Sequence, residues 1–499
     1  MVKIKDIMGK SVKKNYIYNL IYQILTLLFP LVTTPYLSRI LQADGIGTVS
    51  YAESIVSYFV LFATMGIATY GQREISYVQN DTQARSRVFW ETQLLKLITT
   101  SVVLCIYCIF AVLIVDNSIR WLYLILAIQV FSVAVDVVWF FQGMEEFGKI
   151  VTRNIIVRII FIAFVFIFVK TKEDLVYYVL GNALINIVSA MSIWGYLPKY
   201  VKRVSLKSLH PFRNFKVVFA LFIPTIAIQI YTVLDKTMIG LITNNAYENG
   251  YYEQAIKIAK IALSVVTALG TVMIPRIGHH HEKGETKAVC DWMYQSYRFV
   301  WMLAIPMCIG LVFVAGNFVP WFFGDGYEGV IPLLQILSLL LIAIGVNTVT
   351  GNQYLIPTKR EKAYTWTVII GAVVNFVLNL FLIYFFQAIG AAIASVVAET
   401  VIAIVQLIIV KKELSIVIIL KSSVKYVVAG VVMGVVLFFE NIWFSPSILY
   451  TLLMVASGAA VYFLSLLLLR DTFVISNLKT IFGKFIKKHS KEGEENHEI

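Results

Sequence analysis

Apolar segments long enough to cross a membrane recur along almost the whole chain, and no other feature constrains its fold as strongly. A transmembrane helix needs about 20 predominantly apolar residues. Of the 499 residues, 59% are hydrophobic and 14% are charged, and the mean hydropathy is +0.79. Soluble domains carry roughly 25% charged residues. The sequence therefore predicts an all-α polytopic membrane protein.

Fourteen segments meet this criterion, and each is interpreted as a transmembrane helix. The predicted spans are residues 14–41, 47–71, 87–115, 119–141, 150–169, 175–197, 215–242, 249–275, 289–315, 329–352, 363–386, 388–410, 422–439 and 447–469. Spans one to twelve mostly carry one polar stripe at helical spacing, such as Gln129, Ser132 and Asp136, whereas the last two lack it. The predicted architecture is two six-helix lobes plus two C-terminal helices.

Domain boundaries follow from this division and from the most basic connection, which comes after the sixth span. The predicted parts are an N-terminal lobe (1–198), a basic cytoplasmic linker (199–214), a C-terminal lobe (215–412), two further spans (413–469) and a charged, amphipathic cytoplasmic tail (470–499).

The two lobes share sequence features at equal spacing. Gly47 opens the second span and Gly250 the eighth, and these spans end at Arg73 and Arg276. Because six spans is an even number, the lobes would have the same orientation, as parallel repeats related by an axis along the membrane normal.

Lysine and arginine placement predicts the topology. With the N-terminus inside, only Arg120, Lys170 and Lys172 fall in outer connections, and the other connecting segments with basic residues lie inside. Cytoplasmic loops are enriched in Lys and Arg, so both termini are expected to be cytoplasmic. The net charge of +13 is explained by this asymmetry and does not indicate nucleic-acid binding.

Charged side chains within the spans are the candidate functional residues, because each costs about 2.5–3.5 kcal/mol at a helix centre. The hairpin 224–276, with a predicted polar turn at 244–250, carries four of them, and others lie elsewhere. The candidate cations are Lys96, Arg158, Lys236, Lys257 and Lys260, and the candidate carboxylates are Glu53, Asp136, Asp235 and Glu399.

Two interpretations of these charges remain open. They line a water-filled cavity, or they form buried pairs, for example Glu53 with Lys257 or Lys260. Lys236 is also near enough to a span end to snorkel. Asp235 and Lys236 are adjacent in sequence, so they point in different directions and need not pair. The excess of cations suits an anionic headgroup such as a pyrophosphate. If H⁺ or Na⁺ is coupled, the carboxylates are the candidates.

Other chemistry is disfavoured. The chain has no Gly-x-x-x-x-Gly-Lys-Ser/Thr phosphate loop, and its predicted outer loops are short for a polymer-forming enzyme. The four cysteines show no pairing or metal spacing. The run His279-His280-His281 could take a metal, but a solvated loop is favoured. We expect no catalytic residue, no metal and no cofactor.

Several motifs resemble one family. They are Pro35-Tyr-Leu-Ser-Arg-Ile-Leu with Gly45-Ile-Gly, Tyr70-Gly-Gln-Arg-Glu-Ile, Trp139-Phe-Phe-Gln-Gly-Met-Glu-Glu-Phe, Leu234-Asp-Lys-Thr-Met-Ile-Gly, Gly250-Tyr-Tyr-Glu-Gln-Ala and Val272-Met-Ile-Pro-Arg. Together they are similar to the Wzx-type polysaccharide-repeat flippases of the multidrug/oligosaccharidyl-lipid/polysaccharide exporter superfamily. Gln42 departs from the pattern, since the family often has glycine there.

The resemblance implies a MATE-like fold in the bacterial cytoplasmic membrane. It implies flipping of an undecaprenyl-pyrophosphate-linked oligosaccharide, for capsule, exopolysaccharide or teichoic-type polymers, by alternating access through a cationic central cavity. Implied partners are the lipid-linked substrate, membrane lipids, and a polymerase and chain-length regulator of the same pathway. Two alternatives are a multidrug/cation antiporter of the same fold, which deep lysines disfavour, and a polymerase or glycosyltransferase.

Overall fold

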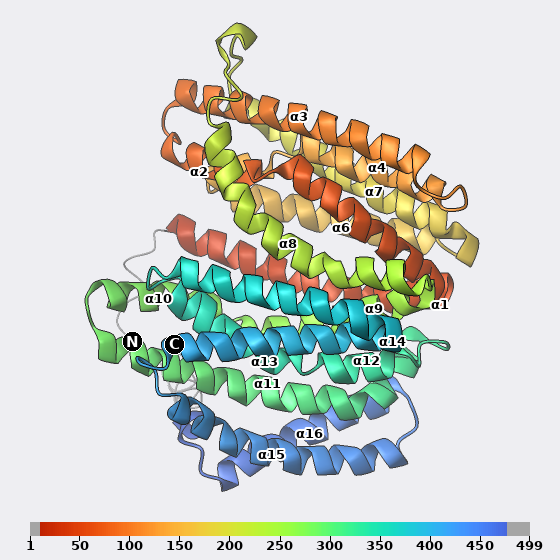
Figure 1. The fold of residues 1–499 in the computed structure, drawn as a ribbon, viewed down its shortest axis with the longest axis vertical. Coiled ribbons are helices and arrows are strands. Elements are labelled where there is room, and N and C mark those ends of the chain that lie inside the picture. The colour runs from red at the N-terminus through yellow and green to blue at the C-terminus, as the bar shows by residue number, and fades with distance from the viewer. Residues whose placement is uncertain (1–9, 477–499) are drawn as a thin grey trace, which may run out of the picture. The chain divides into compact units, whose positions relative to one another are not determined.

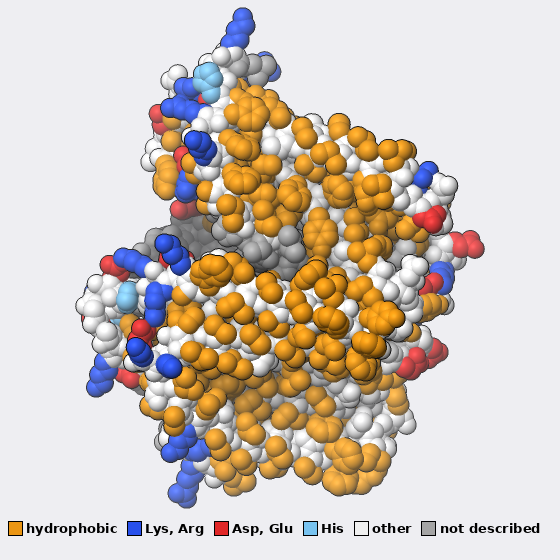
Figure 2. All heavy atoms as spheres, in the orientation of Figure 1, with side chains coloured by type: hydrophobic (Ala, Val, Ile, Leu, Met, Phe, Trp, Pro, Cys, Tyr) orange, Lys and Arg blue, Asp and Glu red, His pale blue; other side chains and the backbone are white. Residues whose placement is uncertain are grey.

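Helices make up most of the chain. The computed structural model describes residues 10–476, among which there is no β-strand. Within this range, ten helices are long and apolar enough to cross a membrane. Figure 2 shows hydrophobic side chains over the middle of the helices and Lys and Arg mostly at one end of them. The all-α membrane prediction is confirmed, while the count of fourteen spans stays a prediction.

The chain divides into two compact units. Unit 1 comprises the residues up to Glu253 together with 323–326 and 379–388, and unit 2 comprises the remainder. The predicted lobe boundaries, which differ from this division, stay a prediction. The predicted tail lies mostly outside the described residues, which end at 476.

Unit 1 contains a bundle in which α1 contacts α3, α4, α6 and α8, and α4 also packs on α3 and α7 (Figure 1). Val56, Tyr107, Leu122 and Leu126 form part of its fully buried core. Its elements are α1 (Lys10–Thr64), α2 (Ile67–Tyr77), α3 (Thr82–Leu113), α4 (Arg120–Val135), α5 (Val138–Gly143), α6 (Phe147–Phe168), η1 (Lys172–Asp174), α7 (Leu175–Ser192), η2 (Ile193–Lys199), η3 (Leu206–Ser208) and α8 (Phe215–Thr243).

Unit 2 begins within α9 and has a core to which Met293, Tyr297, Tyr426 and Tyr462 contribute. The C-terminal helices α15 and α16 pack against each other. Its elements are α9 (Ala246–Thr267), α10 (Gly270–Glu282), α11 (Thr286–Phe323), α12 (Val330–Leu337), α13 (Leu340–Asn347), the π-helix η4 (Thr348–Leu355), α14 (Glu361–Val410), α15 (Ile416–Trp443) and α16 (Ile448–Leu468).

Two predicted outer turns are shorter than expected. The first two spans join at Gln42 alone (φ 58°, ψ 174°), inside α1, so the turn does not extend to 46. The turn predicted at 244–250 contains only Asn244 and Asn245. Asn244 is left-handed (φ 51°), and the Asn245 side chain accepts the Tyr247 N–H at 3.0 Å. This cap satisfies a backbone donor at the start of α9, which can therefore begin at Ala246.

Two predicted spans are interrupted at equivalent places. The second predicted span ends as α1 at Thr64 and resumes as α2 at Ile67, with Met65 and Gly66 at positive φ. The eighth ends as α9 at Thr267 and resumes as α10 at Gly270. Both the ends and the restarts are 203 residues apart, the same spacing as Gly47 to Gly250 and Arg73 to Arg276. The shared motifs thus extend to shared breaks in the backbone.

Candidate functional site

A break in the fourth predicted span organises the polar interior of unit 1. Helix α4 ends at Val135, Asp136 is extended (φ −73°, ψ 122°), and α5 begins at Val138. Such a break removes helical partners from the last carbonyls of α4. Donors from other elements replace them: Gln93 Nε2 to the Ala134 carbonyl, Trp194 Nε1 to that of Val135 and Lys96 Nζ to that of Asp136, each at 2.6 Å. The carbonyls of Ala134, Val135 and Asp136 are therefore paired.

Lys96 and Asp136, a predicted cation and a predicted carboxylate, are brought together here. The Lys96 side chain is 2% exposed and that of Asp136 38%. The Lys96 ammonium lies 3.7 Å from Asp136 Oδ2, farther than from the backbone carbonyl. A buried ammonium is costly unless paired and hydrogen-bonded. The carbonyl is the nearer acceptor, so capping the broken helix is one task of Lys96.

A cavity of about 300 Å³ adjoins this pair. It gathers polar residues from three predicted stripes and from the end of α1: Thr64, Lys96, Gln129, Ser132, Asp136, Asn186 and Ser189. Gln129 Oε1 is buried and has no hydrogen-bond partner among the described residues. The stripes on α3, α4 and α7 therefore face one interior, as the sequence predicts.

An ion pair joins α8 and α9, the two helices of the hairpin at residues 224–276. The Lys236 ammonium on α8 contacts Glu253 Oε2 on α9, with side chains 23% and 19% exposed. Ser50 Oγ on α1 donates to the same carboxylate oxygen at 3.1 Å. Lys236 lies eight residues before Asn244, and Glu253 eight residues after Asn245, so the two-residue turn places them level across the hairpin.

Asp235 has different partners from its neighbour Lys236. Its carboxylate accepts hydrogen bonds from the Tyr252 hydroxyl and, at 2.7 Å, from Asn379 Nδ2. Glu53 accepts one from Asn182 Nδ2 at 3.1 Å. Glu253, Glu53 and Asp235 all interact electrostatically with Lys236. One ammonium thus interacts electrostatically with three carboxylates.

The remaining predicted residues lie elsewhere. Arg158 on α6 is exposed and acts electrostatically on Tyr178, as do Glu53 and Glu253. In unit 2, Lys257 is half-buried and contacts Gln254 Oε1 at 3.4 Å, while Lys260, one turn further along α9, is exposed. Glu399 accepts from Asn347 Nδ2. Their roles in substrate binding or coupling stay predictions.

Sequence reasoning missed Glu253 as a functional candidate. Its partner Lys236 lies eight residues before the two-residue turn, and Glu253 lies eight residues after it. This equal spacing was the available sequence signal. It was hidden because the turn was expected to extend to 250, which shifts the register of the two helices. Among residues 10–476, no three His, Cys, Asp or Glu side chains could jointly hold a metal ion. His280 instead pairs with Glu285.

Comparison with known proteins decides the family. The family described as "Polysaccharide biosynthesis protein" matches residues 12–281, which is more than half of the chain. The chain belongs to this family. It is 23% identical over 413 residues to the "Putative O-antigen transporter" of Shigella dysenteriae, covering 79% of this chain and 99% of that protein. The corresponding Escherichia coli protein is 22% identical over 409 residues, with 81% and 97% covered. The resemblance to Wzx-type flippases is confirmed.

Solved structures agree on the fold of this family member. The inward closed conformation of the lipid II flippase MurJ superposes with a TM-score of 0.68 at 16% identity, covering 89% of this chain and 99% of that chain. An inward-facing MATE multidrug transporter gives a TM-score of 0.59 at 14% identity, with 79% and 99% covered. The MATE-like fold and the multi-pass membrane location are confirmed.

Proposed function

We propose that this protein is a flippase that moves a lipid-linked oligosaccharide from the inner to the outer leaflet of the cytoplasmic membrane. The single observation that carries the proposal is the match along 99% of the protein named "Putative O-antigen transporter". A MurJ-like fold supports it, since MurJ is named as a lipid II flippase. Transport in this form needs no catalytic residue and no cofactor.

The substrate in this proposal carries an undecaprenyl pyrophosphate, and its sugars build a capsule, exopolysaccharide or teichoic-type polymer. Lys257 and Lys260 on α9 are the first candidates to meet the pyrophosphate. They share one helix face, and a half-buried lysine beside an exposed one suits an anion that arrives from water. Lys96, Arg158 and Lys236 are further candidate cations, although Lys96 and Lys236 already have partners.

Alternating access is the proposed mechanism, with two parallel six-helix repeats, two additional helices and both termini in the cytoplasm. The 203-residue spacing of motifs and helix breaks supports the repeat. The carboxylates that interact with Lys236 support coupling to H⁺ or Na⁺. A cation that binds one of these carboxylates changes the net charge of the group. Asp136 and Glu399 are the other coupling candidates. A polymerase and a chain-length regulator complete the proposed pathway.

Depletion of the protein tests the function. Lipid-linked oligosaccharide should accumulate where a membrane-impermeant reagent added outside cannot modify it, and re-expression should restore access. If depletion leaves outer-leaflet exposure and polymer export unchanged, the flippase proposal is wrong.

The double substitution Lys257→Ala and Lys260→Ala tests the cation sites. It should stop polymer export while the protein still inserts in the membrane. Lys362→Ala, an exposed charge at the start of α14, is the matched control and should export normally. Normal export by the double variant contradicts a role for these lysines.

The MATE-like fold keeps a multidrug/cation antiporter as the alternative. Drug efflux that depends on this chain, without any change in polymer export, identifies that function. Sugar transfer or chain lengthening by the purified protein would instead identify a polymerase or glycosyltransferase.

A further inference from the structure

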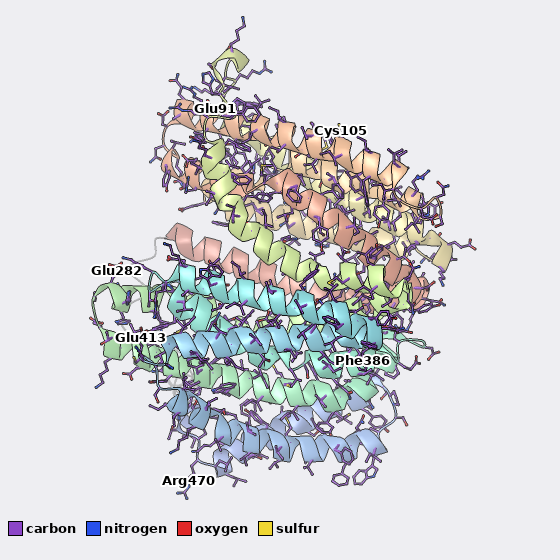
Figure 3. The ribbon with its side chains drawn as sticks, viewed as in Figure 1. Glu91, Cys105, Glu282, Phe386, Glu413 and Arg470 are labelled. Carbon is purple, nitrogen blue, oxygen red and sulfur yellow. The ribbon has the colours of Figure 1, made fainter. Side chains whose placement is uncertain are left out.

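A cavity of about 780 Å³ lies in unit 2. It opens where the α10–α11 connection, the end of η4 and the α14–α15 connection meet. Glu282 and Glu413, labelled in Figure 3, lie at this end of the helices. The residues that matter for its chemistry are His281, Thr286, Lys287, Tyr354, Arg360 and Glu413. By the distribution of Lys and Arg, this end is the cytoplasmic one.

One wall of the cavity contains the Arg360–Glu413 ion pair, whose two charges cancel. Arg360 donates to both oxygens of Glu413, at 3.0 and 2.8 Å, and the Tyr354 hydroxyl donates to the same carboxylate at 2.6 Å. The guanidinium also lies 4.9 Å from the centre of the Tyr354 ring. Bidentate pairs of this type are geometrically specific. The carboxylate that lines the cavity is therefore neutralised within its wall.

The carboxylates at the rim have basic partners as well. Glu282 pairs with Lys359 at 2.6 Å. Glu285 contacts His280 at 2.5 Å and also interacts electrostatically with Lys283. Lys287 lines the cavity, is exposed and has no hydrogen-bond or ion-pair partner among the described residues. Positive charge at this cavity thus exceeds negative charge, with His281 as a further basic group.

Helix α11 adds to this positive potential. It begins at Thr286 and runs for 38 residues, and its first two residues line the cavity. Free backbone N–H groups and the helix dipole favour anions at such a start. Cationic side chain, helix start and cavity volume coincide, and volumes of 300–1,000 Å³ are typical of ligand sites.

We propose that this cavity binds a phosphate-bearing headgroup from the cytoplasmic side, with Lys287 as the principal ionic contact. Two sources share this chemistry: the diphosphate of a polyprenyl carrier and the phosphodiester of an anionic membrane lipid. The site is distinct from the candidate cations on α9. It stands without the proposed flippase function, because it concerns binding alone.

The equivalent place in unit 1 lacks these properties. A pocket of about 180 Å³ is lined by residues that include Ala84 and His210, which precede Lys287 and Glu413 by 203 residues. Arg87 and Arg213 line it together with Glu74 and Glu91, and Glu74 also pairs with Arg73. Glu91, labelled in Figure 3, accepts from Arg87 and from the His210 backbone N–H. The unit 1 pocket is smaller, and two carboxylates line it where one lines the unit 2 cavity.

Binding to the purified full-length protein in neutral detergent tests the proposal. The probes are dihexanoyl phosphatidylglycerol, farnesyl diphosphate, inorganic pyrophosphate and, as the zwitterionic control, dihexanoyl phosphatidylcholine. Lys287→Gln should weaken binding of the anionic probes roughly fivefold, as expected for one lysine near an anionic headgroup. Lys287→Arg should retain binding. Lys362→Gln, the same charge loss outside the cavity, should change it less than twofold.

The outcomes are distinct. Tighter binding of farnesyl diphosphate identifies a polyprenyl carrier, tighter binding of phosphatidylglycerol identifies a membrane lipid, and equal binding of pyrophosphate shows that the phosphate alone is recognised. Each supports the site if Lys287→Gln weakens it. Binding of phosphatidylcholine as tight as that of the anionic probes, or equal losses in Lys287→Gln and Lys362→Gln at unchanged melting temperature, overturns it.

Discussion

Gly47 and Gly250 each pack against the backbone of the residue that lies four positions before the other glycine. A Cβ atom on Gly47 would lie 1.7 Å from the Ala246 carbonyl oxygen, and one on Gly250 would lie 2.0 Å from that of Ala43. Ala43 and Ala246 are themselves 203 residues apart, so the contact is reciprocal. Reciprocal contacts of this kind are characteristic of a two-fold relationship. Small residues four apart allow helix backbones this close.

Substitution of either glycine should therefore destabilise the protein. Gly47→Ala and Gly250→Ala each force backbone to move, at a cost of about 1–3 kcal/mol or more. Thermal unfolding in detergent, followed by loss of the monodisperse chromatographic peak, measures the effect. Gly310→Ala is the control, since nothing lies within 4 Å of its added Cβ. It should be neutral or stabilising, and equal effects at Gly310 and Gly47 would contradict the close contact.

The Lys236–Glu253 pair gives a second prediction. Lys236→Met or Glu253→Met leaves the other charge half-buried without its main partner, and each should lower stability. Replacement of both should cost less than the sum of the two, with a coupling of about 0.5–3 kcal/mol. A double-mutant cycle on thermal stability measures it. As a control, the stability losses of Lys236→Met and Glu146→Gln should add in the double variant, because Glu146 pairs with Lys149.

Lys96 gives a third prediction, which separates its two contacts. Lys96→Met leaves the Asp136 carbonyl without this donor and should lower stability by about 1–3 kcal/mol. Asp136→Asn keeps that carbonyl, and its side-chain oxygen can still accept the Val138 N–H. It should cost clearly less. A loss for Asp136→Asn as large as that for Lys96→Met would show that the carboxylate, and not the carbonyl, is the essential partner.

The sequence predicted class and family better than it predicted pairing. Length and hydropathy suffice for membrane helices, and the polar stripes on α3, α4 and α7 do face one cavity. The helix break after Val135 could not be predicted from local sequence. The carbonyls that it leaves without helical partners accept hydrogen bonds from Gln93, Trp194 and Lys96, which are distant in sequence. Glu253 was not predicted because the Asn245 cap shortens the turn. The length of the turn decides which residues of the two helices lie level with each other.

Acid should weaken the wall of the unit 2 cavity that contains Glu413. Burial alone would raise the pKa of Glu413, but hydrogen bonds from Tyr354 and Arg360 and the charge of Arg360 lower it below its usual range. A carboxyl with a lowered folded-state pKa stabilises the protein above its unfolded pKa and loses that contribution as pH falls through the folded one. Thermal stability should therefore fall below about pH 4.5, the ordinary value for Glu.

Glu413→Gln checks this assignment. The variant should be less stable than the parent at pH 7 and should lose less between pH 6 and pH 4. Glu361→Gln, an exposed carboxyl at the start of α14, serves as the control and should leave the pH profile unchanged. A parental profile in Glu413→Gln would assign the acid sensitivity to other groups.

Gln42 is the last and simplest case, because its backbone conformation suits glycine better. With φ 58° and ψ 174° it occupies a region that is essentially restricted to glycine and costs other residues about 1–3 kcal/mol. Gln387 joins two predicted spans in the same way, at φ 52° and ψ −131°.

Gln42→Gly should therefore raise stability by about 1 kcal/mol, once the greater loss of backbone entropy of glycine on folding is subtracted. This gain is expected even though the variant loses the hydrogen bond from Lys172 Nζ to Gln42 Oε1 at 3.1 Å. Gln42→Ala removes the same side chain but keeps the strain, so only the glycine variant should have a higher melting temperature. A gain of the same size in both variants would assign the effect to the side chain and leave no role for the strained backbone.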